Sequence, residues 1–357
     1  MLRKRLTLWW FLCFVTAGTG SVLAVARFAS GAEKPYYEGK TITIIQATNP
    51  GGTGDLRRKA LAPYLQKYIP GNPTVLFEYM PGGGGRKAGN YIYRSARPDG
   101  LTIGGFSNTL ISAALLGAAG VQYDIDRLIY LGTPTSGGHR VFMTRKEAGL
   151  NSLEKLRSVP GVRIGAQQVG HETYIIGRLF AYLIGLREPR FVTGYSGPEL
   201  DLALMQGELD GRANNAATVI QRTPEWTEKG LMYFHAIIEV PKGNNHPLFG
   251  HLPEIEAFSK SDKERKLLTM QRAFDLVGTP YVLPPGTPKP QVQILQEAMR
   301  KALKDAAFHR QFKKLVEYDP TPLMPEELER AIKEIPREPD VNDLFKMLSG
   351  PDPLPPR

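Results

Sequence analysis

Strand-like runs that end in glycine-rich turns, each followed by a helical pattern, constrain the fold of this chain more than any other feature of its sequence. The first unit joins a β-branched run at 41–47 to a turn at 49–54 and to apolar residues at helical spacing over 55–68. The second unit joins a run at 74–79 to four consecutive glycines at 82–85, and a helical stretch follows. Strands that alternate with helices predict an α/β fold in which helices flank a parallel sheet.

The same alternation continues through the middle of the chain and towards its C-terminus. Further strands are expected at 101–106, 140–145, 163–166, 190–193, 231–240 and 279–284. Further helices are expected at 152–157, 172–186, 198–205, 290–303 and 325–335. The proline-rich tail from Pro351 is expected to be loose. With 357 residues, the chain is long enough for two compact domains.

Residues 1–32 are predicted to be a signal peptide. Three basic residues within the first five positions give a positive start, an apolar run follows over 6–15, and 30–32 offers small residues for cleavage. Cleavage after Ala24 is an alternative. The competing interpretation is a retained membrane anchor, because 6–26 carries no charge, but the glycine, serine and threonine in its second half argue against it. The expected location is therefore the periplasm.

Cysteine content and charge narrow the possible partners. The only cysteine, Cys13, lies inside the predicted signal peptide, so the exported chain can form neither a disulfide nor a thiolate metal site. Removing 1–32, which holds four basic residues and no acidic one, lowers the formal net charge from +10 to +6. The basic residues are dispersed and do not alternate with aromatic ones, so nucleic acid is not an expected partner. A modest positive field favours anionic solutes.

Three turns between a strand and a helix carry the main chemical signal, at 50–55, 81–86 and 170–174. Glycine lets the backbone turn sharply and approach a ligand closely, and the helix that follows directs free N–H groups and its positive dipole end at the turn. Such turns favour a small molecule with carboxylate or phosphate groups. Neither glycine turn has the spacing of a Rossmann or Walker loop. The alternative is that they are tight turns without a ligand.

Catalytic patterns are poor. Gly-x-Ser-x-Gly is absent, and His171-Glu172 begins like a zinc-binding helix but has Ile175 where the second histidine would be needed. His246 and His251 lie in a Pro/Gly-rich loop without a third ligand in view. The sequence therefore predicts neither an enzyme nor a metal site, and no cofactor.

At its glycine turns the sequence resembles the substrate-binding proteins of tripartite tricarboxylate transporters, the TctC or Bug family, and the resemblance covers nearly the whole chain after residue 32. The family's Pro-Gly-Gly-x-x-Asp loop is matched by 50–55, and its Glu-Asn-x-Pro-Gly-Ala-Gly-Gly loop by 78–85. Shorter matches follow in the family's order at 98–102, 170–173, 195–197, 204–210 and 285–288. Each match alone is weak, and their order and spacing together are specific.

The resemblance implies a type II periplasmic-binding-protein fold with a ligand cleft between two α/β lobes. Lobe one is expected to comprise 33–138 and 245–357, and lobe two 139–244. The implied function is capture of a small carboxylate, by a monomer, for the membrane permease subunits of a tripartite tricarboxylate transporter. The alternative is a sensory protein that presents a carboxylate to a membrane receptor kinase. An α/β enzyme with an anionic substrate is a third, weaker interpretation.

The resemblance also implies which residues contact the ligand. The two loops of lobe one would hold a carboxylate through backbone N–H groups, and the loop residues expected at the site are Gly52, Thr53, Gly54, Asp55, Gly83, Gly84 and Gly85. The expected side-chain donors are Thr53, Ser107, Asn108, His171, Thr173, Tyr195 and Asn214.

The sequence departs from the family's usual pattern at three places in this expected site. His171 replaces a small residue, and Asn214 replaces an aspartate that the family often has before an asparagine. Arg86 and Lys87 replace neutral residues and could contact a second anionic group. The alternative for Asn214 and for this basic pair is a position on the surface.

Overall fold

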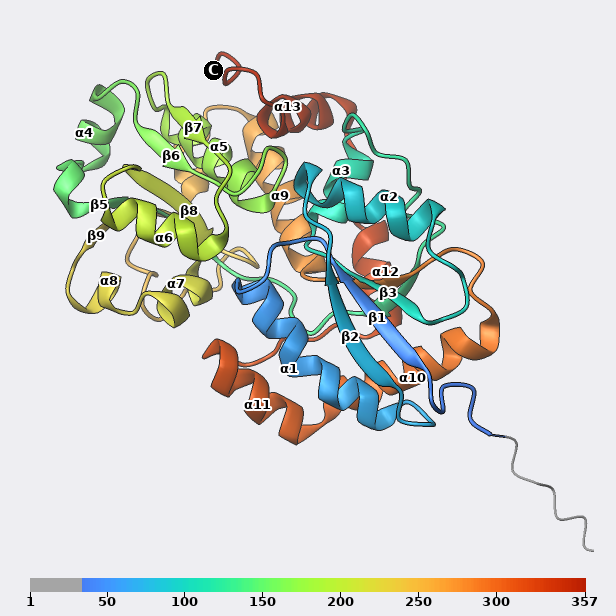
Figure 1. Cartoon of the computed structure of the whole chain (residues 1–357). Coiled ribbons are helices and arrows are strands. Elements are labelled where there is room, and N and C mark those ends of the chain that lie inside the picture. Colours follow the sequence, from blue (N-terminus) through green and yellow to red (C-terminus); the bar gives the residue numbers. More distant parts are fainter. Residues whose placement is uncertain (1–33) are drawn as a thin grey trace, which may run out of the picture. The chain divides into compact units, whose positions relative to one another are not determined.

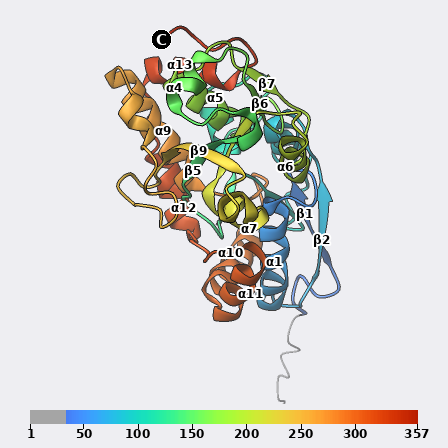
Figure 2. The same cartoon turned by 90° about the vertical axis from the view of Figure 1, so that its left-hand side faces the viewer.

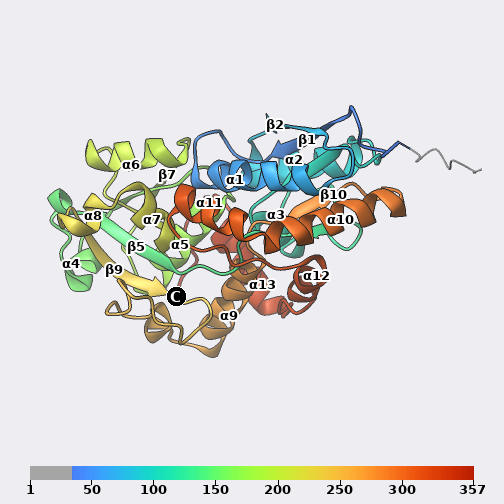
Figure 3. The same ribbon diagram turned by 90° about the horizontal axis from the view of Figure 1, so that it is seen from below.

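Residues 34–357 are described by a computed structural model (Figure 1), and the predicted signal peptide at 1–32 lies outside the described residues. Within the compact unit 36–357, the chain forms two five-stranded sheets covered by helices. The elements between 140 and 238 gather around one sheet, on the left of Figure 1 and of Figure 3. The predicted α/β class is confirmed.

The first sheet has the strand order β2-β1-β3-β10-β4. Its strands are β2 (Thr74–Tyr79), β1 (Thr41–Gln46), β3 (Thr102–Gly105), β10 (Tyr281–Leu283) and β4 (Ile129–Gly132). The first three are parallel, as predicted, whereas β10 runs antiparallel to both of its neighbours. The sheet is therefore mixed, because the chain returns to it from the second sheet in the opposite direction.

Helices cover both faces of this sheet. One layer, visible in Figure 2, consists of α1 (Thr53–Tyr68), α10 (Lys289–Lys304) and α11 (Ala306–Val316). The other face carries α2 (Arg86–Arg94) and α3 (Thr109–Leu115). Neighbouring residues of β1 show the consequence: Ile44 packs in the cluster under α1 and Ile45 in the cluster under α2, and both are buried. Side chains alternate across a strand, so a sheet covered on both faces needs an apolar residue at both positions.

The second sheet has the order β7-β6-β8-β5-β9. Its strands are β7 (Arg190–Val192), β6 (Arg163–Gly165), β8 (Gly211–Asn215), β5 (Arg140–Arg145) and β9 (Met232–Ile238). Its helices are α4 (Leu153–Ser158), α5 (Glu172–Ile184), α6 (Gly197–Met205), α7 (Ala216–Arg222) and α8 (Glu225–Glu228). β5 is antiparallel to β8 and β9, and the other pairs are parallel.

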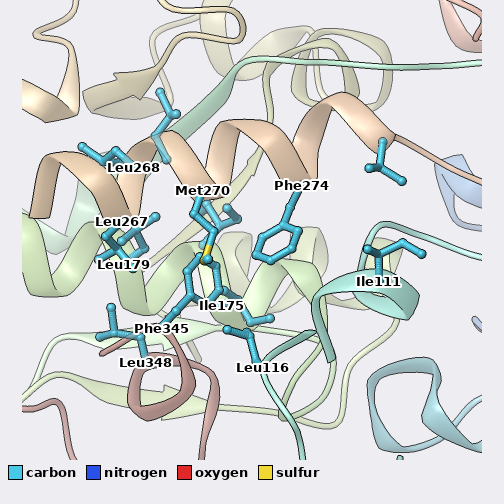
Figure 4. Close-up of a cluster of buried hydrophobic side chains, with 14 of the residues drawn as sticks. Ile111, Leu116, Ile175, Leu179, Leu267, Leu268, Met270, Phe274, Phe345 and Leu348 are labelled. Atoms are coloured by element: carbon cyan, nitrogen blue, oxygen red, sulfur yellow. The ribbon is translucent and has the colours of Figure 1, made fainter. Parts of the chain in front are cut away.

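A buried apolar cluster contains residues from helices of both sheets (Figure 4). Helix α9 (Asp262–Val277) contributes Met270 and Phe274, which share this cluster with Ile111 of α3 and Ile175 of α5. Phe345 of α13 (Pro339–Ser349) closes the cluster and meets Phe274 edge to face, with 5.3 Å between ring centres. Helix α12 (Pro325–Lys333) packs against α9 and β4.

The C-terminal tail is ordered against α5, contrary to the expectation of a loose tail. Arg178 of α5 donates to the carbonyl oxygen of Leu348 at 2.8 Å and to that of Asp352 at 2.6 Å. Arg357 forms a salt bridge with Glu264 at 2.6 Å. The expectation from proline content was therefore wrong, because in the folded protein the buried Arg178 donates to a carbonyl oxygen of this segment and Arg357 at its end pairs with Glu264.

Candidate functional site

A cavity of about 430 Å³ lies between the two sheets, where the connecting segments cross from one to the other. On one side its wall is the turn after β1 and the start of α1. On the other side the wall consists of the turn before α5, the start of α6, the end of β8 and helix α7. The connecting segments at 135–140 and 240–244, the end of α9 with the residues after it, Ser107, Tyr318 and Thr321 form the rest of the wall.

The N-terminus of α1 opens onto this cavity. Gly52 precedes the helix without a side-chain cap, and Gly52, Thr53 and Gly54 line the cavity. No hydrogen bond within residues 34–357 uses the backbone N–H of Thr53 or Gly54 as donor. Gly51 has a φ of +83°, which only glycine adopts readily, and this makes the tight turn possible. Free N–H groups at the positive end of a 16-residue helix favour a negatively charged group at this wall.

Asp55 braces this turn and does not line the cavity. Its carboxylate accepts hydrogen bonds from the Gly51 backbone at 2.9 Å, from Gln46 at 2.8 Å, from Tyr79 at 2.9 Å and from Lys59 at 2.8 Å. Burial alone would raise the pKa of Asp55, but these hydrogen bonds outweigh it and lower the pKa. An ionised Asp55 therefore holds the first glycine turn to β1 and β2.

Arginine dominates the charge of the cavity wall. Five arginines line it: Arg57, Arg58, Arg140, Arg212 and Arg222. Arg57, one turn after Thr53 on α1, forms no salt bridge within the described residues, and its buried Nε has no hydrogen-bond acceptor in the protein. Its guanidinium lies 5.4 Å from the centre of the Tyr318 ring. Arg58 donates to neutral oxygens, Gln46 Oε1 at 3.1 Å and the Phe106 carbonyl at 2.9 Å.

Arg140 is the cavity arginine with the most carboxylate contact. It donates to Asp275 at 2.6 Å and to Glu172 at 3.3 Å. Asn108 also donates to Asp275, at 3.0 Å. Asn108 therefore belongs to this buried network, and it does not line the cavity. Burial alone would raise the pKa of Glu172, but Arg140, together with smaller contributions from His171 and Arg57, outweighs burial and lowers the pKa. Arg140 is thus neutralised by the protein itself.

Arg212 and Arg222 share a single carboxylate. Arg212 on β8 and Arg222 at the end of α7 both pair with Asp201 of α6. The Arg212 side chain is 1% exposed, and its Nε has no hydrogen-bond acceptor among residues 34–357. Two guanidinium groups against one carboxylate leave one excess positive charge at this wall.

His171 caps helix α5 and faces the cavity. Its Nδ1 accepts the backbone N–H of Thr173 at 3.2 Å and lies 3.0 Å from the Thr173 hydroxyl. Burial lowers the pKa of His171, which favours the neutral ring. Because Nδ1 is an acceptor, the proton of the neutral ring is on Nε2, which is a hydrogen-bond donor. The Thr173 hydroxyl accepts from the Gln167 backbone at 3.2 Å, so it orients this loop.

The structure brings half of the predicted site residues to the cavity wall. Those that line it are Gly52, Thr53, Gly54, Ser107, His171, Thr173 and Asn214. Those that do not are Asp55, Gly83, Gly84, Gly85, Arg86, Asn108 and Tyr195. The Tyr195 hydroxyl contacts Glu208 at 3.3 Å.

The second glycine turn contacts the other sheet's loop instead of the cavity. The backbone N–H of Gly84 donates to Gln168 Oε1 at 3.2 Å, and that of Gly85 donates to the Gly82 carbonyl at 3.0 Å. Arg86 lies beside Gly170: a Cβ on that glycine would be 2.8 Å from Arg86 Nη1. Lys87 is exposed. In this structure both glycine N–H groups are therefore already used.

Sequence reasoning missed the arginines and their acidic partners. For Arg57 a signal existed, because a residue four positions after Thr53 lies on the same face of α1. For Arg140, Arg212 and Arg222 none existed, since they are 10 or more positions apart and meet only in the tertiary structure. Within 34–357, no group of three or more His, Cys, Asp and Glu side chains could hold a metal ion. None of the helices described is both long and apolar enough to cross a bilayer.

Comparison with known proteins supports the fold. No family model and no curated protein matches the sequence. Among solved structures, the periplasmic binding protein BugD is 18% identical over 88% of this chain and 99% of its own, with a TM-score of 0.66. MatC from Rhodopseudomonas palustris with bound malate is 18% identical over 87% of this chain and 99% of its own, also at 0.66. An R. palustris protein with adipate is 17% identical over 87% and 97%, at 0.64. The chain therefore has the two-lobed periplasmic-binding-protein fold.

Proposed function

We propose that this chain is a periplasmic solute-binding protein that captures a small carboxylate for a tripartite tricarboxylate-type transporter. One observation carries the proposal: the cavity between the sheets combines an uncapped helix N-terminus with more arginines than carboxylates. Free amides and guanidinium groups are the donors that proteins use to bind carboxylates. The solved relatives with malate and adipate hold molecules of this chemistry.

The proposed ligand contacts combine main-chain and side-chain donors. The amides of Thr53 and Gly54 would bind one carboxylate, with Arg57 beside them, and His171 Nε2 and Asn214 Nδ2 would donate from the opposite wall. The lobes are proposed as 33–138 with 245–357, and 139–244. Closure of the lobes on the ligand would be a shift between open and closed populations. Export by the signal peptide and delivery to permease subunits belong to the same proposal.

A thermal-shift screen of the purified protein tests the proposal. The panel contains mono-, di- and tricarboxylates, aromatic acids, and uncharged and cationic solutes as controls. A ligand at 100 times its Kd stabilises the folded state by about 2.7 kcal/mol, which raises the Tm by about 5 °C for a chain of this size. We expect at least one carboxylate to do this. A rise with neutral or cationic solutes and with no carboxylate would contradict the proposal.

A further inference from the structure

The charges around the cavity do not cancel. Among residues 34–357, five arginines line it, and the carboxylates that form salt bridges with them are Glu172, Asp275 and Asp201. Arg140 takes two of these carboxylates and is more than neutralised. An excess of two positive charges remains. A buried excess of charge is unfavourable unless a counter-charge binds, so the wall as a whole suits a ligand of charge −2.

Arg58 also has no salt bridge within 34–357, and its positive charge offsets the second carboxylate beside Arg140. The remaining excess charge is divided between the two sides of the cavity. On the side of the first sheet, Arg57 has no carboxylate partner within 34–357 and lies one helical turn from the free amides of α1. On the side of the second sheet, Arg212 and Arg222 share Asp201. Arg212 is almost fully buried, and its Nε is a hydrogen-bond donor without an acceptor in the described part of the chain. Each side can therefore receive one anionic group.

The two sides are close enough for one small molecule to reach both. The Thr53 hydroxyl, at the start of α1, lies 3.4 Å from Oε1 of Gln221, the neighbour of Arg222. Gly197, which opens α6 and also lines the cavity, lets the Arg222 guanidinium lie directly over its backbone: a Cβ there would be 2.6 Å from Arg222 Nη1. With about 430 Å³ between the walls, a ligand of several carbon atoms fits.

We infer that Arg212 and Arg222, whose charge Asp201 partly offsets, form a second anion subsite opposite Arg57 and the N-terminus of α1. The ligand is then a small dianion that spans the two subsites. The inference rests on the proposed function and deepens it, because it assigns the second anionic group to β8 and α7 and not to the basic pair after the second glycine turn. A bridging dianion would also draw the two lobes together, since each end binds a different lobe.

Calorimetric titration of the unmodified protein tests this inference without any variant. The probes are unbranched dicarboxylates of three to eight carbons, the monomethyl ester of the tightest binder, and 3-phosphonopropionate. We expect the ester to bind about 10- to 100-fold more weakly than its diacid, because it loses the charge-assisted hydrogen bonds at one subsite. If the phosphonate binds tightly, the second anionic group of the ligand is a tetrahedral oxyanion. If the phosphonate binds weakly and the diacid tightly, the second group is a carboxylate.

Variants then locate the second group. The Arg222→Gln variant should bind the diacid about 10-fold or more weakly than the unmodified protein does. The difference in affinity between diacid and ester should shrink to about threefold or less. In Asp201→Asn the diacid should bind more tightly, because its competitor for the two guanidinium groups is gone. Arg94→Gln, which removes an exposed arginine outside the cavity, is the matched control and should change neither affinity.

The possible failures can be told apart. An ester that binds within threefold of its diacid would overturn the second subsite and leave the carboxylate-binding function intact. If no carboxylate of any kind binds, the proposed function itself fails. If a folded Arg222→Gln variant shows the same difference in affinity between diacid and ester as the unmodified protein, the second anionic group does not bind at Arg222.

Discussion

Single residues decide what the cavity wall offers to a ligand. At position 197 the absence of a Cβ lets Arg222 lie over the start of α6, although the backbone there is not in the left-handed region. At position 55 a carboxylate that could have faced a ligand is instead used to hold the glycine turn. In both cases the residue type is visible in the sequence, but its role depends on neighbours in the folded structure that the sequence does not identify.

Gly197→Ala should weaken dianion binding by about 10-fold, because the new methyl group pushes the Arg222 guanidinium out of its position over the start of α6. The variant keeps the arginine, so the net charge of the protein does not change. The Tm should change little, since alanine fits the helical backbone and a flexible side chain can move aside. Titration calorimetry and thermal melting measure the two effects. Gly177→Ala, also in a helix and against a single Ile164 methyl group at 3.3 Å, is the control. If the unmodified protein, Gly197→Ala and Gly177→Ala bind the dianion with equal affinity, Arg222 does not contact the ligand.

At the level of elements, the two glycine turns of the first sheet serve different purposes. The first opens a helix whose N-terminus has no cap, whereas Ser152, His171, Ser196 and Ser261 cap α4, α5, α6 and α9. The second turn packs its backbone against the loop before α5, through Gly84 and Gln168. One turn therefore contributes donors to the cavity, and the other joins the two lobes.

Gly84→Ala should weaken ligand binding by about 10-fold, because the new methyl group would push the second glycine turn away from the loop before α5 and so hold the two lobes apart. A Cβ on Gly84 would lie 2.6 Å from backbone atoms of Gly170, which cannot move aside as a side chain can. Gly85→Ala is the matched control, because its φ is also positive (+99°, against +64° at Gly84) but its Cβ would meet only ordinary contacts of 3.6 Å. The difference between the two variants isolates the lobe contact from backbone strain, which costs about 1–2 kcal/mol in each. Small-angle scattering should show Gly84→Ala to be more open; identical affinities and profiles would contradict this role.

At the scale of the whole molecule, one apolar cluster connects helices from both sheets. Phe274 of α9 and Phe345 of α13 meet edge to face within it and belong to the same cluster as side chains of α3 and α5 (Figure 4). Unfolding of one lobe would therefore expose core surface of the other. Such continuity predicts a single cooperative transition for residues 36–357.

Phe345→Ala tests this continuity. The cavity left in a close-packed core should lower the free energy of unfolding by about 3–5 kcal/mol. Chemical denaturation followed by tryptophan fluorescence and by circular dichroism should give coincident curves at the lower midpoint. Met347→Ala, an exposed residue on the same helix, should change stability by less than about 0.5 kcal/mol. Two separated transitions would show that the lobes unfold independently.

Buried histidines predict how stability depends on pH. Burial lowers the pKa of His235 from 6.5 to about 4, and its Nε2 lies 2.8 Å from the Thr144 hydroxyl. Between these values the unfolded chain binds a proton that the folded chain does not, so stability falls as pH falls. The full loss from this residue is about 3 kcal/mol, reached near pH 4. His235→Gln should flatten the stability profile between pH 6.5 and 4 in urea titrations; an unchanged slope would contradict the assignment.

The local order of the chain could be predicted from the sequence because its signals are local. Runs such as 74–79 and 140–145 alternate with helical spacing, and the strands β2 and β5 have these bounds. β8 was missed because its sequence, GRANN, has no β-branched residue, although it lies at the centre of the second sheet. Helices α9 and α13 were also missed, and they carry the core between the lobes.

The sequence by itself determined the alternation of strands and helices, the two glycine corners and the uncapped start of α1, since each depends on residues within a few positions of one another. Only the tertiary structure decided which side chains face the cavity. Asp201, Arg212 and Arg222 lie on three different elements, and their charges sum at one wall only after the second sheet has formed. Electrostatic interaction depends on distance in space and on burial, and neither can be read from separation along the chain.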